Sequence, residues 1–285
     1  MSHSCPKCTA SAQNIVRAGH FVRTFDKKRI QRYRCKSCKH KFSAATFHQC
    51  YRQKKRHLNP RVLELYVSGV SQRRIAKLLK ISRTTVARKF FFVAQVCKLK
   101  NQKQFQNLSP LIEVQFDDLV TFEHTKCKPL SVTIFVDRKS RWIVDFEVSQ
   151  MPANGPLSAI SLKKYGPRFD ERRQARDLLF SRLKEKILPG AVIFSDKSPH
   201  YPPSVRKWFP ECFHQTTKGK RGCVTGQGEL KKTGYDVLFS LNHSFAMVRA
   251  NMSRLFRQTW CTTKCRQRLA HHLQMYQWYH NNELI

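Results

Sequence analysis

The sequence predicts a multidomain fold with an N-terminal zinc ribbon, a helical helix-turn-helix domain and a C-terminal α/β domain with a mixed sheet. Three observations support this prediction. Two CxxC pairs stand near the start of the chain, capped segments with helical periodicity follow, and strand-like and helix-like runs then alternate to the end. At 285 residues, the chain is long enough for a medium-sized domain and one or two small modules. We place the domains at residues 1–50, 58–98 and 111–285, with a linker over residues 99–110.

The chain carries a large excess of positive charge. Lys and Arg number 54 against 18 Asp and Glu, which gives a formal net charge of +36. About half of the basic residues lie in residues 1–110, where the acids are Asp26 and Glu64 alone. Nucleic acid is the commonest partner with dense negative charge, so we expect the protein to bind double-stranded DNA. We see neither an apolar signal region nor a run of about 20 apolar residues, so we expect no membrane association and a cytoplasmic, nucleoid-associated protein.

The first segment carries two cysteine knuckles, Cys5-Pro-Lys-Cys8 and Cys35-Lys-Ser-Cys38, which are typical of a zinc ribbon. Each knuckle places two thiolates on one tight turn, and two knuckles complete a tetrahedron around zinc. Between them, residues 15–35 alternate well enough for two short strands joined near Asp26. We therefore predict one structural Zn²⁺ held by Cys5, Cys8, Cys35 and Cys38. A closed site with four sulfur ligands leaves no open position, so this metal is not catalytic.

Residues 59–98 have the caps and the periodicity of short packed helices. Asn59-Pro60 is a typical helix start, and Ser71 and Ser82 are candidate caps of two further helices. In a helix-turn-helix motif, the second helix enters the major groove of DNA. The alternative is a plain three-helix bundle that carries surface charge. We predict that the exposed side of the last helix contacts DNA through Arg83, Thr84, Thr85, Arg88 and Lys89.

The third segment alternates in the order β-β-β-α-β-α-β-α, which predicts a mixed sheet flanked by helices. The predicted strands cover residues 111–123, 130–140, 141–151, 190–196 and 212–217, and the predicted helices cover residues 168–188 and 202–209 and a basic stretch from residue 240.

Two carboxylates occupy positions in this order where chemistry is common. Asp117 lies within the first predicted strand, and Asp196 ends the fourth. Open α/β sheets place their sites at strand ends, and adjacent strands would bring these two residues side by side. Two close carboxylates repel each other unless a cation holds them, and their oxygens suit Mg²⁺ or Mn²⁺. We therefore predict a divalent-metal site at Asp117 and Asp196, and we expect Asp118 to be a solvated or capping neighbour.

These features together resemble the small bacterial insertion-sequence transposases with an RNase H-like DDE catalytic domain, close to the insertion-sequence-one group. "QFDDLVTFEHTK" resembles the first acidic motif of that family, and "FSDKSPHYPP" resembles the second. The stretch "NHSFAMVRANMSRLFRQTWCTTK", with a later "YHNN", resembles the third block. The resemblance covers nearly the whole chain, and it implies catalytic roles for Asp117 and Asp196.

The third acidic position departs from the family pattern. Where the family commonly has Glu, this sequence has Asn242, so the resemblance implies an amide as the third catalytic residue and metal ligand. Relatives of such families also use Asn or His there, and Glu229 and His243 are alternative ligands. The same match implies phosphate contacts for Arg249, Arg254, Arg257 and Lys264.

The resemblance implies a DNA transposase. Residues 60–95 would recognise terminal inverted repeats with help from the ribbon, and the α/β domain would cleave DNA with Mg²⁺ or Mn²⁺ and use the freed 3′-OH to attack target DNA. Because both element ends must be joined in one complex, we expect a homo-oligomer on DNA. One alternative is a non-enzymatic transcriptional regulator, for which Asp117 and Asp196 need not be close. Another is an inactivated copy of a transposase.

Overall fold

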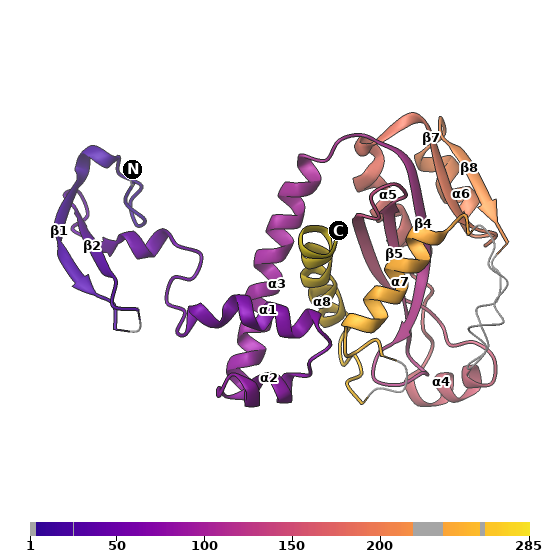
Figure 1. Ribbon diagram of the computed structural model, residues 1–285, viewed down its shortest axis with the longest axis horizontal. Helices are drawn as coiled ribbons and strands as arrows, with labels where there is room; N and C mark the ends of the chain where they lie inside the picture. The colour runs from indigo at the N-terminus through magenta and orange to yellow at the C-terminus, as the bar shows by residue number, and fades with distance from the viewer. Residues whose placement is uncertain (1–3, 25, 219–235, 257–259) are drawn as a thin grey trace. The chain divides into compact units, whose positions relative to one another are not determined.

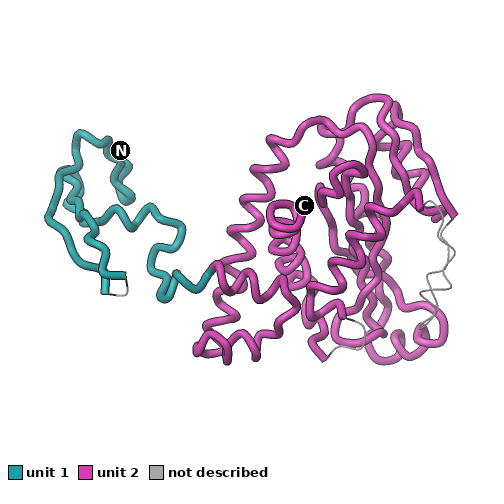
Figure 2. Tube along the Cα trace, viewed as in Figure 1, with its two compact units in different colours: residues 1–59 teal, residues 60–285 magenta. Residues whose placement is uncertain are grey.

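The computed structural model describes residues 4–24, 26–218, 236–256 and 260–285. The chain divides into two compact units, residues 1–59 and residues 60–285, which Figure 2 shows in different colours. The second unit contains both the predicted helix-turn-helix region and the predicted α/β region. Within the described residues, no helix combines the length and the apolar character that a membrane span needs.

The first unit is a small antiparallel sheet with very little core. Its strands are β1 (Ile15–Val22), β2 (Arg29–Cys35) and β3 (Lys41–Ser43), in the order β1-β2-β3. Short 3₁₀ turns precede and follow them at Ala12–Asn14, Ala44–Phe47 and Arg56–Leu58. The buried apolar cluster consists of Cys5, Cys35 and Phe42. A cluster this small cannot offset the entropy of ordering the chain, so the unit needs an additional source of stability.

Three helices open the second unit, α1 (Asn59–Val67), α2 (Gln72–Leu78) and α3 (Arg83–Gln106). The predicted cap at Ser82 is present, since its hydroxyl oxygen accepts the Thr85 backbone N–H at 3.1 Å. Gly69 follows α1 with a φ of +73°, a conformation that favours glycine. A Cβ at this position would lie 2.5 Å from the Phe256 ring. The turn between α1 and α2 therefore favours glycine for its backbone, and the Phe256 ring of the loop after α7 packs against it.

The predicted linker over residues 99–110 is wrong for residues 99–106, which continue α3. Within this segment, Asn101 bonds to the C-terminal helix α8 (Arg266–Tyr279), and Gln104 bonds to Asn282 just beyond it. Asn101 is buried, and its Nδ2 donates to the Gln274 carbonyl at 2.9 Å and to the Gln277 Oε1 at 3.1 Å. The amide-rich composition therefore reflects a polar helix–helix contact. The remaining residues, 107–110, connect α3 to the sheet.

A five-stranded mixed sheet lies at the centre of the second unit, in the order β6-β5-β4-β7-β8. The central strand β4 pairs antiparallel with β5 and parallel with β7. The edge strand β6 is antiparallel to β5, and the other edge strand β8 is parallel to β7. Their bounds are β4 Leu111–Phe122, β5 Pro129–Asp137, β6 Ile143–Gln150, β7 Ile187–Asp196 and β8 Phe213–Thr217.

Helices cover both faces of this sheet. On one face, α5 (Arg172–Leu183) and α6 (Tyr201–Trp208) pack in the cluster that contains Phe116 of β4. On the other face, α7 (Phe239–Asn251) runs beside β4 and β5 and shares its cluster with α8, α1 and α3 (Figure 1). Two helices were not predicted, namely α4 (Leu157–Tyr165) and α8. A short 3₁₀ turn (Lys184–Lys186) precedes β7, and a π-helical turn (His280–Leu284) follows α8.

A buried polar relay fastens the first helices to the α/β region. The Arg254 Nε donates to the His272 Nδ1 at 3.0 Å, so the other ring nitrogen, Nε2, carries the proton that it donates to the Tyr66 carbonyl, also at 3.0 Å. Burial lowers the pKa of His272 to about 3 and the pKa of Arg254 to about 10. His272 is therefore neutral and Arg254 charged near pH 7, which is the protonation state that this relay requires.

Candidate active site

Asp117 and Asp196 lie side by side at one end of the sheet. The last registered pair between β4 and β7 is Gln115 with Phe194, and each aspartate follows two residues later on its own strand. Both line a pocket of about 350 Å³ at the carboxyl end of β7. The other residues that line it are Asp118, Asp170, Arg172, Arg173, Arg176, Ser198, Pro199, His200, Tyr201 and Pro203.

The Asp117 carboxyl is held in an environment that disfavours its charge. Burial raises its pKa to about 6, and the nearby charges of Asp196 and Asp118 add to this effect. Hydrogen bonds from the Tyr201 hydroxyl at 2.7 Å and from the Asp118 backbone N–H at 2.7 Å act in the opposite direction. A buried carboxyl with a raised pKa beside two further carboxylates is typical of a site that a cation completes.

Tyr201 positions Asp117 from the start of α6. Its ring packs against Phe116 with centroids 4.8 Å apart, while its hydroxyl donates to the Asp117 Oδ1. Burial raises the pKa of Tyr201, so the hydroxyl keeps its proton and remains a donor. Tyr201 is not among the predicted site residues, although it stands in the same "SDKSPHYPP" stretch as Asp196.

Asp118, which was expected to be a solvated or capping neighbour, is half-buried and also lines the pocket. Its Oδ1 accepts a hydrogen bond from the Thr133 hydroxyl of β5 at 2.5 Å. The Asp196 Oδ1 accepts the Ser198 backbone N–H at 2.9 Å, which shapes the loop after β7. The pair of consecutive acids in "QFDDL" was the available signal for a third carboxylate.

Asn242 does not line this pocket. It is exposed on α7, and its Nδ2 donates to the Asp236 Oδ2 at 2.9 Å. The prediction that it faces Asp117 and Asp196 is therefore not met by the contacts of its side chain. The Asp236 Oδ1 also accepts the Leu238 N–H at 3.0 Å, so Asp236 supplies the carboxylate that the positive end of α7 favours.

Gln115 of β4 anchors the start of α7 close to the pocket. Its Oε1 accepts the Leu241 N–H at 2.9 Å, and its Nε2 donates to the Val237 carbonyl at 2.6 Å. Of the two alternative ligands, His243 is half-buried beside the Phe239 ring, and Glu229 lies outside the described residues. Gln115 lies two residues before Asp117 on β4, so its hydrogen bonds fix the first turn of α7 close to Asp117.

The residues predicted to contact phosphates do not line the pocket among the described residues. Arg254 serves the relay to His272, and its guanidinium also lies 5.8 Å from the centre of the Phe90 ring, so its role as a phosphate ligand is not supported by its contacts. Arg249 is half-buried in the last turn of α7, and Lys264 is exposed with its Nζ 3.1 Å from the His124 Nδ1. Arg257 lies outside the described residues.

The start of α3 presents most of its predicted DNA contacts to solvent. Arg83, Thr84 and Arg88 are exposed, and Thr85 is half-buried beside the cap. Lys89 is a correction, because its exposed fraction is 2%. It shares the inward face of α3 with Val86, Phe90 and Val93, so the predicted exposure of Lys89 is wrong.

We expect Arg83→Ala and Arg88→Ala to reduce discrimination between the DNA bordering the protein's own gene and random DNA. Loss of a base contact costs about 1–3 kcal/mol of discrimination, whereas loss of a phosphate contact weakens all sequences alike. Fluorescence anisotropy with both duplexes measures the difference. Arg74→Ala is a matched control, because Arg74 is an exposed arginine on α2. Equal loss on both duplexes in the Arg83 and Arg88 variants would remove α3 as the recognition helix.

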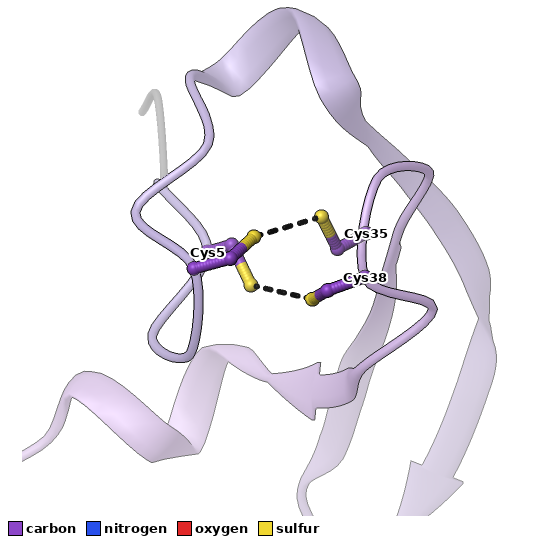
Figure 3. Close-up of side chains that lie close together, drawn as sticks. Cys5, Cys35 and Cys38 are labelled. Atoms are coloured by element: carbon purple, nitrogen blue, oxygen red, sulfur yellow. Dashed lines mark hydrogen bonds between the residues drawn. The ribbon is translucent and has the colours of Figure 1, made fainter.

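The four cysteines of the first unit converge as predicted. Their sulfur atoms all lie within 4.8 Å of one another, and the Cys5–Cys38 and Cys8–Cys35 Sγ pairs are each 3.6 Å apart. Figure 3 shows Cys5 facing the Cys35–Cys38 knuckle. Sulfur ligands about 2.3 Å from a tetrahedral zinc would lie about 3.8 Å apart, so the cluster fits this metal. The Cys38 backbone N–H contributes most to lowering the pKa of Cys35, to about 6, which favours the thiolate that binds metal.

No family model and no curated protein matches the chain. Among solved structures, the chain is similar to the catalytic domain of the Mos1 mariner transposase. The two share 13% sequence identity over 65% of this chain and 87% of that chain, with a TM-score of 0.25. Because both values are low, we base the function on the residues of this chain and not on that likeness.

Proposed function

We propose that the protein is a DNA transposase of an insertion sequence. The observation that supports this most directly is the placement of Asp117 and Asp196 on adjacent parallel strands, where both line one pocket with Asp118. The exposed basic start of α3 and the net charge of +36 favour DNA as the substrate. The four-cysteine cluster adds a structural zinc to the first unit.

The pocket fits a divalent metal by the chemistry of its donors. Asp117, Asp118 and Asp196 offer carboxylate oxygens, and burial, with a smaller contribution from the charges of Asp196 and Asp118, raises the pKa of Asp117. When bound there, Mg²⁺ or Mn²⁺ would activate the attacking water or 3′-hydroxyl and stabilise the leaving oxygen. Tyr201 keeps Asp117 oriented through its hydroxyl, and the residues at the start of α3 hold the DNA.

The third ligand remains a proposal. The hydrogen bond of Asn242 to Asp236 uses the amide nitrogen, so the amide oxygen is the atom that it would offer to a metal. Asp118 is the competing ligand, because it already lines the pocket. Asn242→Ala and Asp118→Ala variants separate these choices, since the true ligand should shift the metal requirement of cleavage to higher concentration.

A strand-transfer assay tests the proposed function. The full chain is incubated with Mn²⁺, duplexes carrying the DNA that borders its gene, and a target plasmid. A transposase should produce nicks at the element ends and covalent joints between those ends and the plasmid. The alternative of a non-enzymatic regulator predicts specific binding without metal-dependent cleavage. Because both ends must be joined in one complex, we also propose a homo-oligomer on DNA, which light scattering of the DNA complex measures.

A further inference from the structure

Arg176 is a buried cation that the described residues leave without hydrogen-bond partners. It lies on α5 with an exposed fraction of 2%, and it lines the pocket that contains Asp117 and Asp196. Its Nε and Nη1 atoms are buried and have no hydrogen-bond partner among the described residues. Leaving buried donors on a charged group unsatisfied is costly, so a retained arginine of this kind indicates a ligand.

Two other arginines of α5, Arg172 and Arg182, are paired, and Arg173, which also lines the pocket, is exposed to solvent. Arg172, one turn earlier on α5, makes a two-pronged contact with Asp170, with its Nε 2.9 Å from Oδ1 and its Nη2 2.5 Å from Oδ2. Arg182, further along α5, donates to Asp145 at 2.8 Å and to Glu147 at 2.9 Å. Carboxylates are therefore the ordinary partners of these arginines, yet none of the four aspartates in the pocket makes such a bond to Arg176 among the described residues.

Tyr201 holds the Arg176 guanidinium in place. The guanidinium carbon lies 4.7 Å from the centre of the Tyr201 ring, a distance typical of a cation–π contact. An arginine stacked in this way keeps the N–H groups in its plane available to an anion. Since the same tyrosine donates its hydroxyl to Asp117, one side chain connects the cation to the acid. A ligand of Arg176 would therefore lie close to Asp117.

We propose that Arg176 binds a phosphodiester oxygen of the DNA strand that enters this pocket. The inference rests on the proposed function for its substrate and adds a subsite to it. Four aspartates and three arginines line the pocket, so the acids outnumber the arginines. A bound divalent metal reverses the sign of this charge difference, and the pocket then favours an anion. Phosphate oxygens match the fork of a guanidinium, and such charge-assisted bonds are about 2.7–2.9 Å long. Asp117 and Asp196 then face the metal, and Arg176 faces the strand.

The dinucleotide TpT is a suitable probe, because it carries one phosphodiester and is too short to span the helix-turn-helix. NMR of the arginine Nε–H groups of the full chain, recorded in Ca²⁺, reports binding at a single side chain. The Arg176 signal is the one that disappears in Arg176→Lys. We expect that signal to shift on titration with TpT and to saturate. The signal of Arg206, an exposed arginine on α6 identified through Arg206→Lys, should stay in place.

Arg176→Gln should weaken TpT binding about 10- to 100-fold, the usual effect of losing hydrogen bonds to a charged group. Arg206→Gln, which removes the same charge outside the pocket, should leave it unchanged. An Arg176 signal that does not respond to TpT would overturn the proposal, and the wild-type titration gives this answer even if the variants fold poorly. Because TpT binding requires no strand cleavage, a saturating shift in a protein without transposase activity would reject the proposed function and retain the phosphate site.

Discussion

Asp117→Asn and Asp196→Asn should each abolish metal-dependent strand cleavage, by a factor of about 10³ or more, while DNA binding through α3 is retained. Each change removes one charged ligand from the shared pocket, and residues that act as one unit show non-additive losses. The double variant should therefore be no slower than either single variant. Single-turnover cleavage of end-labelled duplex in Mn²⁺ measures the loss, and anisotropy measures binding.

The Asp117→Asn variant should also be more stable than the wild type in the absence of metal. Burial raises the pKa of Asp117 from 3.8 to about 6, so the folded state binds the proton more tightly than the unfolded state does. The free energy of unfolding of the wild type therefore falls as the pH rises from about 4 to 6. The difference between these two pKa values corresponds to about 3 kcal/mol of unfolding free energy, which the wild type has lost at pH 7. The amide of the Asp117→Asn variant does not ionise, so the variant does not lose this stability. Urea unfolding at pH 4 and pH 7 in EDTA measures this difference.

Asp137→Asn is the matched control for these variants. Asp137 also ends a strand of the sheet, but it accepts the Ser140 N–H at 2.7 Å in a turn and does not line the pocket. It should keep full cleavage and show no gain in stability at pH 7. Residual turnover in Asp196→Asn protein, free of wild-type contamination, would remove Asp196 from the catalytic role. Loss of stability in Asp117→Asn would contradict the raised pKa.

The position of the two acids could be predicted because it depends on strand order alone. Once β4 and β7 are recognised as strands, the only remaining requirement is that they be neighbours, and their parallel pairing then brings Asp117 and Asp196 to the same end. Asn242 was harder to place, because the orientation of a residue on α7 depends on how that helix is anchored. Its anchors are Gln115 and Asp236, and neither contact has a signature in the sequence.

Two further errors concern residues whose environment is set by α8. The amides of residues 99–106 resemble a linker in composition, but Gln274 and Gln277 of α8 accept hydrogen bonds from the Asn101 Nδ2. Arg254 resembles a phosphate ligand until His272 of α8 is placed beside it. Arg176 is the opposite case, because its significance comes from the hydrogen bonds that it does not make among the described residues. Partners on α8 determine the first two cases.

Removal of zinc should unfold the first unit and leave the second unit folded. Binding of structural zinc contributes about 10–16 kcal/mol in small zinc domains, far more than a core of Cys5, Cys35 and Phe42 can supply. The second unit has its own apolar clusters on both faces of its sheet, so it does not depend on the metal. We expect about one zinc per chain in the wild type and none in Cys35→Ser. Limited proteolysis should then cut within residues 1–59 and spare residues 60–285.

Cys50→Ser is the matched control for this experiment. Cys50 belongs to the same unit, but it lies outside the four-sulfur cluster, and its sulfur accepts a hydrogen bond from the Asn59 Nδ2 at 3.6 Å. A serine oxygen can accept the same bond, so this variant should keep its zinc and its resistance to protease. If freshly purified protein contains no zinc, or if Cys50→Ser loses it as completely as Cys35→Ser does, the cluster of Cys5, Cys8, Cys35 and Cys38 is not the metal site. If Cys35→Ser loses zinc while residues 1–59 stay resistant to protease, the metal binds to this unit but does not stabilise its fold. Other interactions must then stabilise the unit.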